Sequence, residues 1–197
     1  MPVHKAVAFA DGSRIFGHGT AAVALKSSDA SNYGETLGIM AISFKKGNVT
    51  AGCMELCGIC VSMDMALRLT ETFPDGDTLW LTAWCDNEIV LEMCVDATVA
   101  ESCGLTHLTP LLHCIEQRKA EFRRGGHRSE FRVPRHRRRS RFIREVDRLA
   151  HNVREARRNC PASQIPEDVY GALRISAEIL ENARRIDLDV YEKMLRH

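Results

Sequence analysis

Four acidic residues of this chain stand beside segments that a folded core would hold rigid, which is where a metal site can be built. Asp11 and Asp86 each follow an apolar run. Glu55 lies near the start of an amphipathic segment, and Asp147 lies within another. Four carboxylates gathered at one place repel one another and raise each other's pKa, and bound divalent cations neutralise this repulsion. Oxygen ligands suit Mg²⁺ or Mn²⁺, and two such ions about 4 Å apart can support phosphodiester hydrolysis. The competing interpretation is four separate surface acids.

The hydrophobic pattern predicts the elements that would bring these carboxylates together. Three strands joined by short turns form an antiparallel meander, and a fourth strand follows a helix of about five turns that starts at Ala51. These strands cover residues 5–11, 20–26, 36–45 and 79–85. A strand, a crossover helix and a strand in this order make a parallel pair. Asp11 and Asp86 are therefore expected to end neighbouring strands at one sheet edge, with Glu55 on the helix between them.

The remaining elements complete an α/β fold. Helices are predicted over 87–100, 109–124 and 142–158, with a short fifth strand over 130–133. The expected sheet is five-stranded and mixed, three antiparallel strands followed by two parallel ones, and it is flanked by helices. We expect a catalytic domain over 1–158 and a C-terminal helical extension over 159–197. The apolar stripe of that extension must bury against the domain, a second copy or a partner protein.

Composition and charge limit the classes of protein. The chain has 197 residues, 45% of them hydrophobic, which is enough for a proper core. No secretory signal or membrane-spanning run is visible, and most of the eight cysteines lie in apolar segments, so we expect reduced thiols and a cytoplasmic protein. The net charge of +1 hides an asymmetry, because residues 118–160 hold 16 Lys and Arg against 5 Asp and Glu. Such a basic segment favours a phosphate-bearing partner.

The ordered set of motifs resembles ribonuclease H type 1. The resemblance covers about residues 4–158, and the matching segments are Asp11–Ser13, Cys53–Leu56, Cys85–Val90, Val133–His136 and Val146–Ala150. It implies an RNase H-like fold in which Asp11, Glu55, Asp86 and Asp147 hold two Mg²⁺ (or Mn²⁺) ions. It also implies an endoribonuclease that cuts the RNA strand of RNA/DNA hybrids. The resemblance gives His136 a role in handling water or releasing product.

The resemblance also implies a nucleic-acid-binding set, and this set departs from the family pattern. The expected contacts are Gly12, Ser13, Thr50, Asn87, Arg135, Arg137, Arg138 and Arg139. The family often has paired asparagines that read RNA 2′-hydroxyls, where this chain has Ala51 and Gly52. Arg135 replaces a glycine and Ile143 replaces an asparagine. The alternative is therefore a divergent nucleic-acid-binding module, or a nuclease of different specificity, acting within a complex.

Three further motifs have competing interpretations. Cys53, Cys57 and Cys60 have the spacing of a radical-SAM iron–sulfur motif, but they fall in a helical pattern and are better explained by packing. The arginine run from Arg135 fits a nuclear-localisation signal or a phosphate-binding patch. Trp80 and Trp84 alternate along the fourth strand and are most simply residues of the core or of a sheet face.

Overall fold

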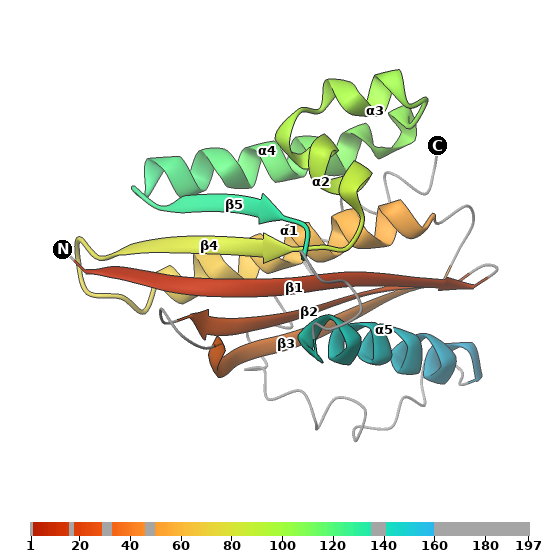
Figure 1. The fold of residues 1–197 in the computed structure, drawn as a ribbon, viewed down its shortest axis with the longest axis horizontal. Coiled ribbons are helices and arrows are strands. Elements are labelled where there is room, and N and C mark those ends of the chain that lie inside the picture. Colours follow the sequence, from red (N-terminus) through yellow and green to blue (C-terminus); the bar gives the residue numbers. More distant parts are fainter. Residues whose placement is uncertain (1, 16–17, 29–32, 46–49, 135–140, 160–197) are drawn as a thin grey trace.

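A mixed five-stranded sheet organises the protein (Figure 1). The computed structural model describes residues 2–15, 18–28, 33–45, 50–134 and 141–159. The strands are β1 (Val3–Ile15), β2 (His18–Ser28), β3 (Tyr33–Lys45), β4 (Thr78–Trp84) and β5 (Arg128–Arg132). Their order in the sheet is β3-β2-β1-β4-β5. β2 is antiparallel to both β1 and β3, whereas β4 is parallel to both β1 and β5. The predicted sheet and its strand directions are confirmed.

Helices cover the sheet on two sides (Figure 1). The helices are α1 (Ala51–Thr70), α2 (Glu88–Val95), α3 (Thr98–Ser102), α4 (Thr109–Arg124) and α5 (Arg141–Asn159), with a 3-10 turn at Thr106–Leu108. On one side, α1 packs against the sheet and α4 packs against α1. On the other side, α5 packs against β1, β2 and β3.

The two cores follow from the alternation of side chains along β1. Ala6, Ala8 and Ala10 face α1, whereas Val7 and Phe9 face α5. The small alanines let α1 lie close to the sheet. Phe9 stacks on Phe142 of α5 with ring centroids 5.3 Å apart. Asp11 continues the Val7 and Phe9 side of the strand, so its carboxylate belongs to the side of the sheet that carries α5.

The sequence of α1 is apolar around its whole circumference because the helix lies between the sheet and α4. All its residues from 54 to 63 are buried. Thr50 begins the helix, and its Oγ1 accepts a hydrogen bond of 3.1 Å from the N–H of Cys53. Cys57 and Cys60 are buried core residues of α1, in agreement with the packing interpretation, and the cysteines within the described residues are free thiols.

Two predicted boundaries were wrong. The first strand does not end at Asp11, because β1 stays paired with β2 through Ile15 opposite His18. The predicted helix 87–100 is two helices, since Asp96 is extended and its Oδ1 accepts hydrogen bonds from the N–H and the hydroxyl of Thr98. An aspartate that bonds the backbone two residues on competes with helix continuation.

Some predictions fall outside the described residues. They are the extension beyond Asn159, His136 and the arginines at 135, 137, 138 and 139. The domain boundary near residue 158 therefore stays a prediction. Among the helices that the structure does describe, none is long and apolar enough to cross a membrane.

Candidate metal centre

Strand register places Asp11 and Asp86 side by side. β1 and β4 run parallel, and their last paired residues are Phe9 and Trp84. Asp11 and Asp86 each come two residues after that pair, on the same side of the sheet. Their position follows directly from the parallel crossover that the sequence predicts.

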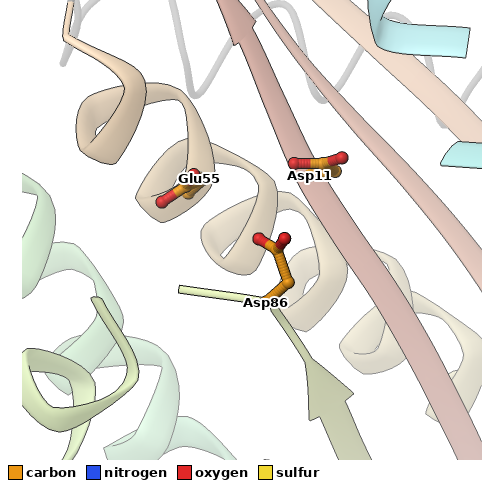
Figure 2. Close-up of side chains that lie close together, drawn as sticks. All are labelled: Asp11, Glu55 and Asp86. Carbon is orange, nitrogen blue, oxygen red and sulfur yellow. The ribbon is translucent and has the colours of Figure 1, made fainter. Parts of the chain in front are cut away.

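Glu55 reaches the same point from the opposite side of the sheet because α1 crosses β1 very closely at Gly12. A Cβ atom at Gly12 would lie 2.6 Å from the Cβ of Met54 and 2.8 Å from the backbone nitrogen of Glu55. Only a residue without a side chain allows this approach. One carboxylate oxygen each of Asp11, Glu55 and Asp86 consequently lies within 4.8 Å of the others (Figure 2).

Hydrogen bonds orient two of these carboxylates. Asp11 Oδ1 accepts a bond of 2.7 Å from the N–H of Gly12. Asn87 Nδ2 donates to Glu55 Oε2 at 2.6 Å, and Asn87 Oδ1 accepts from the N–H of Val90 at 3.3 Å, which caps α2. Asn87 therefore couples the start of α2 to the direction of the Glu55 carboxylate.

The site is strongly acidic. Burial raises the pKa of Asp11 from its ordinary value of 3.8 to about 7. The Gly12 N–H opposes this rise, and the negative charges of Asp86, Asp147 and Glu55 add to it. The side chain of Asp147 is exposed on α5, yet its charge acts on Asp11. The structure therefore brings three of the four predicted carboxylates together, and Asp147 lies outside their cluster.

A divalent cation fits this donor set. The three clustered side chains offer carboxylate oxygen atoms within 4.8 Å of one another, and Asp11 and Glu55 are buried. Buried carboxylates at this separation need a compensating positive charge, and hard oxygen ligands favour Mg²⁺ or Mn²⁺.

Solved structures share this architecture. The N-terminal RNase H domain of rv2228c from Mycobacterium tuberculosis superposes with a TM-score of 0.54 at 20% identity, covering 78% of this chain and 95% of that one. LC11-RNase H1 in complex with RNA/DNA hybrid gives 0.51 at 13% identity over 76% and 96% of the two chains. The PFV RNase H domain gives 0.51 at 16% identity over 77% and 93%. The fold is that of ribonuclease H type 1. No family model and no curated protein matches the sequence.

Within this ribonuclease H fold, three residues expected to contact nucleic acid have structural partners. Thr50 caps α1 and Asn87 holds Glu55. The Ser13 hydroxyl accepts a bond of 2.8 Å from Nη1 of Arg154, which also donates to the carbonyl of Arg14 at 3.0 Å. Nucleic-acid contact by Gly12, Ser13, Thr50 and Asn87 stays a prediction. The link between Arg154 and Ser13 ties α5, which carries Asp147, to the strand that carries Asp11.

Part of the basic segment serves the ribonuclease H fold itself. Arg118 on α4 donates to Asp64 on α1 at 2.8 and 3.3 Å, and its side chain is only 12% exposed. Lys119 donates to the carbonyl of Cys94 at 3.0 Å and pairs with Glu116. These cations stabilise helix packing, so the charge count of residues 118–160 overstates what is available to phosphate.

The raised pKa of Asp11 predicts how stability depends on pH without metal. Between pH 3.8 and about 7 the folded protein keeps a proton on Asp11 that the unfolded chain releases. Stability should therefore fall as pH rises through this window in the presence of chelator. Urea unfolding across the window measures the slope, and Asp11→Asn should flatten it. An equal slope in the variant would contradict the pKa assignment.

Two substitutions of Asn87 distinguish the effect of its bond to Glu55 from the effect of its cap on α2. Asn87→Ala removes the cap and the bond to Glu55, so we expect a loss of about 1 kcal/mol in stability and about tenfold in Mn²⁺ affinity. Asn87→Ser keeps a capping oxygen but lacks the amide that reaches Glu55, so only Mn²⁺ affinity should fall. Urea unfolding and calorimetric Mn²⁺ titration measure the two effects. Unchanged affinity in both variants would show that the bond to Glu55 does not matter.

Proposed function

We propose that this protein is a metal-dependent endoribonuclease that hydrolyses the RNA strand of RNA/DNA hybrids and leaves a 5′-phosphate and a 3′-hydroxyl. The observation that carries the proposal is the convergence of Asp11, Glu55 and Asp86 from three elements to within 4.8 Å. The raised pKa of Asp11 also supports the proposal, because a buried carboxyl group whose ionisation is unfavourable fits a cation-binding role.

Each carboxylate has an assigned task. Asp11 and Asp86 hold two Mg²⁺ or Mn²⁺ ions most directly, and Glu55 and Asp147 complete the ligand set. When bound, the ions supply an activated water and stabilise the leaving oxygen. Asn87 keeps the Glu55 carboxylate aimed at the site, and the Gly12 N–H does the same for Asp11. His136 assists water handling or product release.

The substrate assignment rests on fold and charge. LC11-RNase H1, which shares the fold, was solved in complex with RNA/DNA hybrid. We assign phosphate contacts to the arginines at 135, 137, 138 and 139, and further nucleic-acid contacts to Gly12, Ser13, Thr50 and Asn87. Phosphate contacts of this kind weaken with salt.

A second function has one observation in its favour. Ala51 and Gly52 begin α1 beside the site and offer no side-chain donor or acceptor for a 2′-hydroxyl. Because such contacts distinguish RNA from DNA, a nuclease of different specificity, or a divergent binding module in a complex, is the alternative.

One labelled strand presented in four contexts tests the proposal. The contexts are RNA/DNA hybrid, duplex RNA, single-stranded RNA and duplex DNA, each with Mg²⁺, with Mn²⁺ and with chelator. Metal-dependent cutting of the hybrid's RNA strand alone is expected. Cutting of another context would keep the site and reject hybrid specificity. Binding without any cutting would reject the enzyme and support the binding module.

A further inference from the structure

One side of β4 and β5 is left uncovered by the described helices. α5 packs against β1, β2 and β3 on this side. The helices that pack against β4 and β5 are α1, α2 and α4, whose apolar side chains belong to the core on the opposite side (Figure 1). We call this surface the open sheet face, and define it by Lys5, Trp80, Thr82, Arg128, Glu130 and Arg132.

Strand register arranges the open sheet face in rows. The first row is Lys5, Trp80 and Arg128, from β1, β4 and β5. Lys5 and Arg128 are exposed and Trp80 is half-buried, with Lys5 Nζ 5.8 Å from the Trp80 ring centroid. Trp80 therefore lies between two cationic residues of its row.

The acidic residue of this face is already neutralised. Glu130 accepts a bond of 2.6 Å from the Thr82 hydroxyl and one of 2.9 Å from Nη2 of Arg132. The face is consequently cationic, with an aromatic residue at its centre, which suits phosphates and bases together. Base stacking on aromatic rings beside positive charge is how single strands are bound without sequence preference.

The strands of the open sheet face lead toward the candidate metal centre. The row after Thr82 and Glu130 is Phe9, Trp84 and Arg132, in which Phe9 and Trp84 pack in the core that includes α5, whereas Arg132 is exposed. Asp86 follows Trp84 by two residues, so a nucleic-acid strand lying along β4 would point toward the carboxylates.

We propose that the open sheet face binds single-stranded nucleic acid that continues from the cleavage site. The choice of ligand class rests on the proposed function, but binding to this face does not require cleavage. Lys5 and Arg128 contact phosphates, and the Trp80 ring stacks against a base. The cations favour nucleic acid over an apolar protein segment.

Charge reversal tests this proposal in the full-length chain. The probe is a fluorescein-labelled oligouridylate, and binding is followed by anisotropy with chelator present so that no cutting occurs. Lys5→Glu and Arg128→Glu should each weaken binding about tenfold, because each replaces a phosphate-binding cation with a negative charge. Arg123→Glu is the matched control, because Arg123 is exposed on α4 on the opposite side of the sheet. Equal weakening by all three variants, or by none, would overturn the proposal.

Tryptophan fluorescence tests the stacking contact separately. The chain has two tryptophans, so Trp80→Phe leaves Trp84 as the reporter. The oligonucleotide should quench the unmutated protein and quench Trp80→Phe far less. Quenching that is the same in both proteins, or absent from both, would contradict stacking on Trp80 and would leave a protein segment, residues 160–197 included, as the occupant. Because no cutting is measured, a failed cleavage assay would not change this result.

Discussion

Replacement of Asp11 by asparagine should lower the rate of hybrid cleavage at least about a thousandfold, equivalent to about 4 kcal/mol in the barrier. Asparagine keeps the shape of the side chain but removes the negative charge nearest the proposed ions. The substitution also removes a buried acid that Asp86, Asp147 and Glu55 oppose. The variant should therefore fold, and in chelator near neutral pH it should be more stable than the unmutated protein. Hybrid binding should persist.

Glu92→Gln is the matched control for Asp11→Asn. Glu92 is exposed on α2, outside the carboxylate cluster, and its neutralisation should leave cleavage unchanged. Single-turnover cleavage and urea unfolding of both variants measure rate and stability. An Asp11→Asn protein that still cuts at the unmutated rate would contradict the assignment. An unfolded one would instead contradict our account of the charge repulsion.

Replacement of Gly12 by alanine should destabilise the protein by about 2–3 kcal/mol, as overpacking of a tight core does. The new Cβ would lie 2.6 Å from the Cβ of Met54 and 2.8 Å from the nitrogen of Glu55, so α1 must move away from β1. Since α1 carries Glu55, the same movement should weaken Mn²⁺ binding. Urea unfolding and calorimetric Mn²⁺ titration measure the two effects.

Gly52→Ala provides the comparison within the same helix. A Cβ at Gly52 meets its nearest atoms, in Val90 and Leu108, at 3.6 and 3.9 Å, which is ordinary contact. Alanine in place of glycine in a helix gains up to about 1 kcal/mol. Stability should therefore hold or rise in Gly52→Ala and fall in Gly12→Ala. Similar losses in the two variants would show that close crossing at Gly12 is not what positions Glu55.

The sequence predicted the positions of Asp11 and Asp86 well because both depend on strand order alone. An apolar run, a crossover helix and another apolar run require a parallel pair, and the structure has Phe9 opposite Trp84. The place of Glu55 near the start of α1 followed from the same pattern. The extent of β1 beyond Asp11 did not, because an Asp-Gly pair is as typical of a turn as of a strand that passes close to a helix.

Contacts between distant parts of the chain could not be predicted. Arg154 bonds to Ser13, 141 residues away, and no local pattern indicates this pair. The bond from Asn87 to Glu55 also joins separate elements, although an asparagine directly before a helix does predict the cap on α2. The row of Lys5, Trp80 and Arg128 depends on the register of three strands, and register is set by the whole sheet rather than by any one segment.

The metal centre is tested most directly by counting bound Mn²⁺ ions with electron paramagnetic resonance in the unmutated protein, in Asp11→Asn and in Glu92→Gln. We expect two ions in the unmutated protein and in Glu92→Gln, and a clear loss of affinity in Asp11→Asn. Binding that is absent from the unmutated protein, or equal in all three proteins, would contradict a metal centre built from Asp11, Glu55, Asp86 and Asp147.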